Sequence, residues 1–277
     1  MAKMTEEFKP SKWLDFFLLD ESWKKGTGKN VEIAIIDSGI EVSHPRLKGK
    51  IIESVEAYVE NNKISFRSSD GKDSTGHGTA CAGIITSIAP EAKLYSIKVL
   101  DEAVSNDARF LIAGLEYAIR RKFRLINLSV GTTKTQYLAP LHELLDRAYQ
   151  IGSIIVAAAN NLPQPSYPSA FCSSLISVRR SNEENPFNFG FHYGETTELT
   201  APGVNILSCW QNGSFKRVTG NSFACSHIVG IIALILEKCP ILTPFQVKTI
   251  LYEIARKNKN ETSSKLANHS FSIQDSN

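Results

Sequence analysis

Short, unbroken apolar runs recur along this chain, and most of their residues are Val, Ile, Leu and Ala. Runs without polar alternation are typical of strands that are covered on both faces of a sheet. The pattern therefore predicts strands at residues 31–36, 93–100, 125–129, 153–158 and 175–178.

The stretches between these runs have a helical pattern, which predicts helices at residues 78–87, 106–121 and 136–150. Strands that alternate with helices indicate an α/β fold with a doubly wound, mostly parallel sheet and helices on both faces. In such a sheet, functional side chains gather at the carboxyl ends of the strands. Asp37 and the pair Asn160-Asn161 follow predicted strands at that edge.

Near the end of the chain, residues 206–210 and 215–218 flank Asn212-Gly213, which predicts a β-hairpin. A largely apolar helix is predicted directly after it, from Ser222 to Leu236. A helix that is apolar all round belongs in the interior of a protein. The positive end of its dipole would then favour negative charge beside Ser222.

The 277 residues, 42% of them hydrophobic, suffice for one large domain with a substantial core. We assign residues 23–257 to this domain, after a short N-terminal segment at 1–22. Residues 258–277 form a polar tail without periodicity, which we expect to be mobile.

Composition makes several partners and compartments improbable. A net charge of +3 gives no reason to expect a nucleic acid or an anionic membrane as partner. The longest strongly apolar stretch, residues 228–236, is too short to span a bilayer. The N-terminus lacks a signal-peptide core, and the five cysteines have no paired spacing, so we expect a reducing, cytoplasmic location.

Three short segments carry an acid, an imidazole and a hydroxyl at the edges of apolar runs, namely Asp37, His77 and Ser222. A serine hydroxyl is a weak nucleophile and needs a base, which in turn needs an orienting carboxylate. Alone, each residue has a structural explanation as a turn aspartate, a buried histidine or a helix-capping serine. Together they favour nucleophilic catalysis.

The flanks of these residues, at 37–45, 74–83 and 220–226, resemble the motifs of the subtilisin-like serine proteases, and the resemblance spans about residues 23–254. The order Asp, His, Ser is also that of subtilisin. The resemblance implies a subtilisin-like fold and an endopeptidase that acts on peptides or proteins through an acyl-enzyme. Asn221 and Ser226 depart from it, because the family usually has threonine and proline there.

The family supplies a side-chain donor to the oxyanion from an Ala-Ala-Gly-Asn segment, matched here by residues 157–161. Ungapped alignment implies Asn161 as that donor, with Asn160 as the alternative. Asn160 would then replace a glycine, which asparagine can do because it tolerates the left-handed conformation. The backbone N–H of Ser222 is the expected second donor.

The resemblance also implies substrate-binding residues. Ser129, Val130 and Gly131 match one wall of the family's cleft. Asp101 and Glu102 stand where the family has glycine-rich text. They favour basic or polar substrate side chains several positions before the cut, although two acids also suit a solvated loop.

We expect no cofactor and no metal. The calcium loop that interrupts the histidine helix in many subtilisins is missing, because residues 83–90 run straight on to the next strand. Arg46 replaces a family carboxylate and would repel a hard cation. The tight calcium site is therefore predicted to be absent.

Two other functions stay open, a non-catalytic binding or scaffold module and a peptide ligase or macrocyclase that uses the same triad. We favour an intracellular processing protease, because little sequence precedes residue 23 and a broad protease in the cytosol would need restraint. Cys81 lies one helical turn after His77 and is expected beneath the site.

Overall fold

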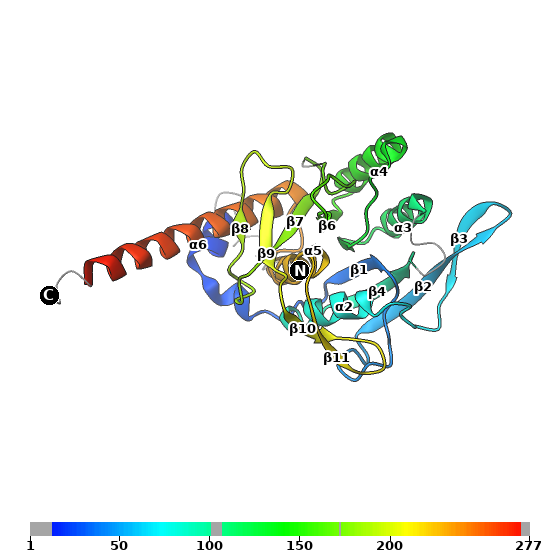
Figure 1. Ribbon diagram of the computed structural model, residues 1–277, viewed down its shortest axis with the longest axis horizontal. Coiled ribbons are helices and arrows are strands. Elements are labelled where there is room, and N and C mark those ends of the chain that lie inside the picture. Colours follow the sequence, from blue (N-terminus) through cyan, green and yellow to red (C-terminus); the bar gives the residue numbers. More distant parts are fainter. Residues whose placement is uncertain (1–12, 101–106, 172, 273–277) are drawn as a thin grey trace, which may run out of the picture.

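The computed structural model describes residues 13–100, 107–171 and 173–272. Its centre is a nine-stranded sheet, flanked by a two-stranded hairpin (Figure 1). The sheet contains β1 (Glu32–Asp37), β2 (Ile51–Glu60), β3 (Lys63–Ser68), β4 (Lys93–Lys98), β5 (Leu125–Leu128), β6 (Ile154–Ala158), β7 (Ile176–Ser181), β8 (Gly190–Phe191) and β9 (Leu199–Pro202), and the hairpin contains β10 (Ile206–Cys209) and β11 (Phe215–Val218).

The sheet has the order β3-β2-β4-β1-β5-β6-β7-β9-β8. The seven strands from β2 to β9 in this order are parallel to their neighbours. Only the edge strands β3 and β8 are antiparallel to theirs. The order runs outward in opposite directions from β1 and β5, and the carboxyl ends of strands at such a switch point form a crevice. Asp37 ends β1 and Ser129 follows β5, so both lie at this crevice.

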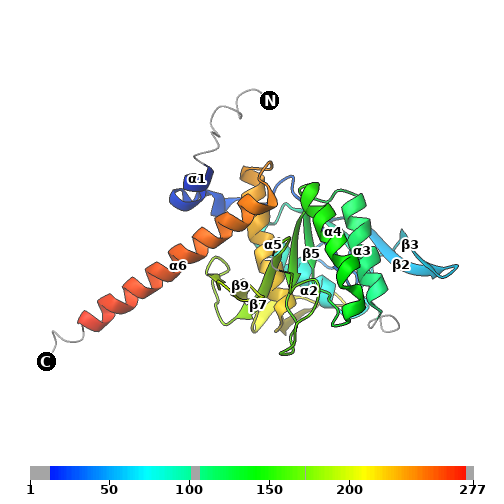
Figure 2. The same cartoon turned by 90° about the horizontal axis from the view of Figure 1, so that it is seen from above.

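Helices cover both faces of the sheet (Figure 2). α2 (His77–Ile88) and α5 (Asn221–Lys238) lie on one face, and α3 (Ala108–Arg120) and α4 (Leu138–Gln150) lie on the other. Alternate residues of β1 enter the two cores. Ile33 and Ile35 pack in the core that contains α5, whereas Ala34 and Ile36 pack in the core that contains α3 and α4. This double burial explains the unbroken apolar run.

α5 is the central helix of the molecule, and residues 221–236 are all buried. By length and apolar composition α5 would pass as a membrane span, but 89% of it is buried inside the protein. It is therefore a core helix of the kind that the apolar run predicted. Ser222 lies in its first turn, so the nucleophile candidate stands on a rigid element.

The predicted α/β fold is confirmed, as are the five predicted strands, the three predicted helices and the hairpin before Ser222, and no predicted end differs by more than three residues. The sequence analysis missed the β2–β3 hairpin. Its loop is Asn61-Asn62, with φ of 50° and 59°. Two consecutive left-handed residues are the signature of a tight hairpin turn.

The two terminal segments differ from the sequence-based division. α1 (Trp13–Leu19) and the 3-10 helix η1 (Glu21–Lys25) pack on the core, so the boundary at residue 22 does not separate two packing units. The boundary at residue 257 falls inside α6 (Pro244–Ser272), which extends away from the body of the molecule (Figures 1 and 2). The described part of the polar tail that was expected to be mobile thus continues this helix as far as Ser272.

Candidate active site

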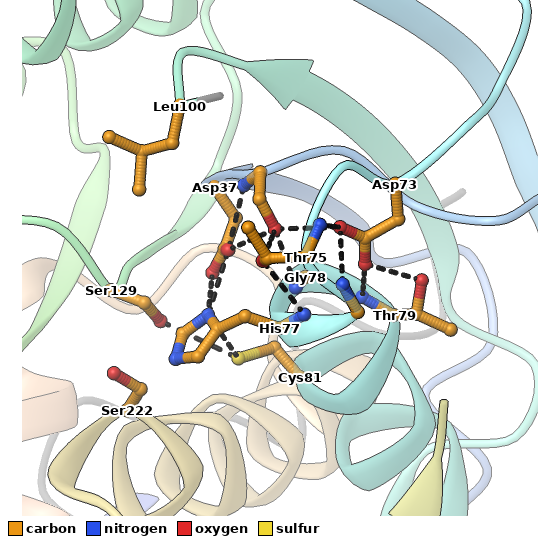
Figure 3. Close-up of polar contacts among 12 residues, drawn as sticks. Asp37, Asp73, Thr75, His77, Gly78, Thr79, Cys81, Leu100, Ser129 and Ser222 are labelled. Atoms are coloured by element: carbon orange, nitrogen blue, oxygen red, sulfur yellow. Dashed lines mark hydrogen bonds and ion pairs between the residues drawn. The ribbon is translucent and has the colours of Figure 1, made fainter. Parts of the chain in front are cut away.

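Asp37 and His77 meet where β1 ends and α2 begins. The Nδ1 atom of His77 lies 2.8 Å from Oδ1 and 3.0 Å from Oδ2 of Asp37 (Figure 3). A carboxylate accepts hydrogen bonds, so Nδ1 carries the proton and Nε2 is left as the basic atom of the neutral ring. Asp37 also accepts a hydrogen bond from the backbone N–H of Ser38 at 2.7 Å.

The two groups shift each other's pKa. Burial by itself would raise the pKa of Asp37, whose side chain is 1% exposed, but the charge and hydrogen bond of His77 outweigh it and lower that pKa. Burial alone would lower the pKa of His77, but the electrostatic interactions and hydrogen bonds of the ring with Asp37 and Cys81 together outweigh burial and raise the pKa well above 6.5. His77 thus accepts a proton more readily than an isolated imidazole does.

Asp73, which the sequence analysis missed, holds the turn that presents His77. Its Oδ1 accepts hydrogen bonds from the N–H groups of Thr75 at 3.0 Å and Gly76 at 2.9 Å, and from Ser38 Oγ at 2.8 Å. Its Oδ2 accepts from the N–H and the hydroxyl of Thr79 at 2.8 and 2.6 Å (Figure 3). An acid just before a helix start is the signal that would have found it, because carboxylates satisfy the free N–H groups there.

Ser222 lies on the far side of the imidazole from Asp37, with its side chain beside the ring (Figure 3). It is 6% exposed, and the ring of the next residue, Phe223, packs on His77 at 5.2 Å between centroids. No hydrogen bond joins Ser222 and His77 among the contacts of the described residues. Such bonds often tighten only when substrate is bound.

The two oxyanion candidates differ in orientation. Asn161 Oδ1 accepts hydrogen bonds from the backbone N–H of Asn221 at 3.0 Å and from Arg180 Nη1 at 2.9 Å. Asn160 Oδ1 instead accepts from the N–H of Leu162 at 3.1 Å in its own loop. Asn160 is also not among the described residues with positive φ, so it does not adopt the left-handed conformation that was invoked for its replacement of a glycine.

The predicted cleft wall lies beside Ser222. Ser129, Val130 and Gly131 line a cavity of about 320 Å³ together with Ser222, Asn160 and Asn161. Gly131 packs closely against the neighbouring backbone, because a Cβ at this position would lie 3.2 Å from the Tyr167 carbonyl oxygen. Asp101 and Glu102, the other predicted substrate-binding residues, lie outside the described residues.

Cys81 lies beneath the imidazole as expected. Its Sγ is 3.9 Å from His77 Nδ1 and 3.7 Å from Ser129 Oγ. Within the part of the chain that the structure describes, Asp37, His77 and Cys81 form the group close enough to share a metal ion, with ligand atoms within 4.8 Å of one another. Sulfur and imidazole suit soft metals rather than calcium, and here Asp37 and His77 already bind each other.

Comparison with known proteins gives a consistent set of relatives. Residues 28–270 match the model of the subtilase family, Peptidase_S8. The minor extracellular protease Epr of Bacillus subtilis is 36% identical over 251 residues, which are 86% of this chain and 36% of Epr. Subtilisin E of the same species is 32% identical over 246 residues, which are 83% of this chain and 61% of that protein. The chain thus spans about a third and about three fifths of these two relatives.

Solved structures show the same fold. Sphericase superimposes with a TM-score of 0.70 at 24% identity, over 82% of this chain and 84% of its own. A cold adapted subtilisin-like serine proteinase superimposes with a TM-score of 0.66 at 26% identity, over 80% and 81% of the two chains.

Proposed function

This chain belongs to the subtilase family of serine peptidases, and from this membership and the site geometry we propose that it is an endopeptidase that hydrolyses peptide bonds through Asp37, His77 and Ser222. The observation that carries the proposal is the 2.8 Å contact between His77 Nδ1 and Asp37, with Ser222 beside the opposite side of the ring. This arrangement gives the ring one oriented proton and one basic nitrogen that faces a hydroxyl.

In the proposed reaction, Ser222 Oγ attacks the carbonyl carbon of the peptide while its proton passes to His77 Nε2. Asp37 stabilises the imidazolium that results. The C–N bond then breaks, the amine leaves with the proton from His77, and the acyl group stays on Ser222 as an ester. Water hydrolyses this ester with His77 again as the base.

Asn161 and the backbone N–H of Ser222 are the proposed donors to the oxyanion of the tetrahedral intermediate. The support is the orientation of the Asn161 amide, whose Oδ1 is engaged by Asn221 and Arg180. The Nδ2 group is then at the other end of the amide and is available as a donor. Donors aimed at a developing oxyanion are commonly the largest single contribution to catalysis.

We further propose that the enzyme has no tightly bound calcium and needs none. α2 is continuous from His77 to Ile88 and leads through a short turn into β4, which supports the predicted loss of the calcium loop. Arg46 adds a cation where the resemblance implied a carboxylate.

A cytoplasmic processing role is the finer part of the proposal. Its support is chemical, since Cys81, Cys209, Cys225 and Cys239 are all free and buried thiols, which suits a reducing compartment. Restriction to one class of peptide is proposed because a broad protease would endanger other proteins in the same compartment. A random peptide library tests this directly: one dominant cleavage motif supports processing, and cleavage of most sequences contradicts it.

The decisive experiment labels the protein with a fluorophosphonate probe and measures intact mass. We expect one adduct on the wild type, none on Ser222→Ala, and unchanged labelling in the presence of a calcium chelator. No adduct on folded wild type would contradict the proposal and favour a binding module. Product masses from a cleaved peptide then separate hydrolysis from ligation, because only hydrolysis adds the mass of water.

A further inference from the structure

Arg180 contacts the side chain of Asn161, the candidate oxyanion residue. It lies on β7, which runs parallel to β6, and the loop after β6 carries Asn161. The Nη1 atom of Arg180 donates a hydrogen bond to Asn161 Oδ1 at 2.9 Å. A guanidinium is charged at every pH that the protein meets, so this bond places a positive charge beside the Asn161 amide.

Asn221 closes the arrangement from the side of the nucleophile. Its backbone N–H donates to Asn161 Oδ1 at 3.0 Å, and its side-chain Oδ1 accepts from the backbone N–H of Arg180 at 2.9 Å. Its Nδ2 donates to the carbonyl oxygens of Ala159 at 3.1 Å and Asn160 at 2.7 Å. An asparagine side chain has a carbonyl oxygen that accepts and an amino group with two N–H donors, so it can make these three hydrogen bonds at once, whereas a threonine hydroxyl has a single donor.

These contacts fix the direction of the Asn161 amide. Two donors converge on Oδ1, and a flipped amide would bring Nδ2–H against both of them, which leaves donors without acceptors. Nδ2 donates to none of the residues that the structure describes, so it is free to face the reacting carbonyl. Losing Arg180 would leave the backbone N–H of Asn221 as the single donor that keeps this direction.

The charge of Arg180 is also uncompensated, unlike that of its neighbour. Arg179 pairs with Glu195 at 2.7 Å, whereas no carboxylate among the described residues lies within 4.0 Å of Arg180. Both arginines line one cavity of about 540 Å³ that also contains Asn161. The field of Arg180 therefore acts on the site without a counter-charge at hand.

We propose that Arg180 is a positioning residue of the oxyanion hole, which locks the Asn161 amide with Nδ2 toward Ser222 and strengthens it as a donor. A hydrogen bond to one end of an amide polarises the other end, so Nδ2–H becomes the better donor. The same charge favours the negative oxygen of the transition state over the neutral carbonyl of the substrate. The inference rests on the proposed endopeptidase function.

The test compares Arg180→Met with the matched variant Arg179→Met, which removes the same charge from the preceding position of the same strand. We expect kcat of Arg180→Met to fall about ten- to a hundredfold with KM nearly unchanged, because the lost bond involves a charged donor. Arg179→Met should keep the wild-type kcat. Arg180→Lys, which retains the charge, should regain part of the rate.

A double-mutant cycle shows whether Arg180 acts through Asn161. In an Asn161→Ala background we expect Arg180→Met to lower kcat much less than it does in the wild type, because only the longer-range effect of the charge on the oxyanion remains. Two results would overturn the proposed role of Arg180 but leave the endopeptidase function intact. One is an equal kcat for Arg180→Met and Arg179→Met, and the other is a loss of kcat from Arg180→Met that is as large in Asn161→Ala as in the wild type. A wild type that hydrolyses no peptide would instead overturn the endopeptidase function. Thermal unfolding of each variant identifies loss of rate that comes from misfolding.

Discussion

At the scale of single residues, the site depends on a charged pair in a poorly solvated place. Burial opposes the negative charge of Asp37 and the positive charge of His77, and each charge is held by the other. Catalysis needs the opposite state of the ring, namely the neutral imidazole that can accept a proton from Ser222. The pH dependence of activity should therefore report on the pair.

We predict that kcat/KM loses activity on the acid side with a midpoint well above pH 6.5. The pKa of His77 is raised by Asp37, so the neutral base forms only as the pH rises through that raised value. Asp37→Asn should move the midpoint down and lower kcat on the order of 10⁴-fold, because an amide neither stabilises the imidazolium nor fixes the tautomer. A pH profile of both proteins decides this, and an unmoved midpoint would contradict the assigned pair.

The same pair makes the free energy of unfolding depend on pH, and the two groups give slopes of opposite sign. The lowered pKa of Asp37 gives stability that is present above its usual 3.8 and is lost as the pH falls through the lowered value. The raised pKa of His77 gives stability that is present below 6.5 and is lost as the pH rises through the raised value. Unfolding in denaturant at several pH values should show both slopes weakened in Asp37→Asn.

The two neighbouring asparagines should separate cleanly in kinetics. Asn161→Ala is expected to lower kcat by about 10² to 10³, the range known for removal of the side-chain donor from the oxyanion hole of a subtilisin. Asn160→Ala removes only the bond from its side chain to the N–H of Leu162 and should lower kcat far less. If the order of the two effects were reversed, Asn160 would be the donor.

At the scale of elements, the central strands and helices could be predicted because burial on both faces leaves a plain apolar pattern. The β2–β3 hairpin escaped because its strands are half exposed and its polar positions break the pattern. α6 escaped because its C-terminal half is polar and has no strong periodicity. The contact between Arg180 and Asn161 could not be predicted at all, since it follows from the pairing of β6 with β7 and from no motif.

The contact between the end of β1 and the start of α2 leads to a prediction about Gly78. A Cβ at Gly78 would lie 2.1 Å from the carbonyl oxygen of Gly39, which no side chain allows. Gly78→Ala should therefore push α2 away from β1, separate His77 from Asp37 and lower kcat by about 10² or more. Peptide hydrolysis by the folded variant measures this effect.

Gly49 provides the control for Gly78. It has a φ of 77°, and a Cβ there would meet no atom within 4 Å. Gly49→Ala should lower stability by about 1 to 2 kcal/mol through backbone strain alone and keep kcat unchanged. A wild-type kcat for Gly78→Ala would show that the close approach is not needed for the site.

Across the whole molecule, the site and the chain that leads into β1 lie at opposite ends of α5. Ser222 is in the first turn of this helix, whereas Glu237 near its last turn accepts hydrogen bonds from the N–H groups of Thr27 and Gly28, both at 2.7 Å. With 18 residues, α5 is about 27 Å long. The chain just before β1 thus lies far from the cleft, and Phe17 and Trp23, which precede it, contribute to the core.

Trp23 is the largest buried side chain in the core at this end of α5. It is fully buried, it donates from Nε1 to the carbonyl oxygen of Phe17 at 3.0 Å, and it packs edge-on against Phe17 and Phe187. Trp23→Ala should lower the free energy of unfolding by about 3 to 5 kcal/mol. Because the site lies at the other end of α5, kcat of the folded fraction should stay at the wild-type value.

Leu19→Ala is the matched control, since Leu19 lies in the same N-terminal region but is 81% exposed. It should change stability by less than about 0.5 kcal/mol. Urea unfolding combined with active-site titration measures both quantities on one sample, because titration counts the folded sites and the rate per site gives kcat. A fall in the rate per site of Trp23→Ala would mean that the N-terminal segment also shapes the catalytic end. Unchanged stability would mean that the segment is dispensable for the fold.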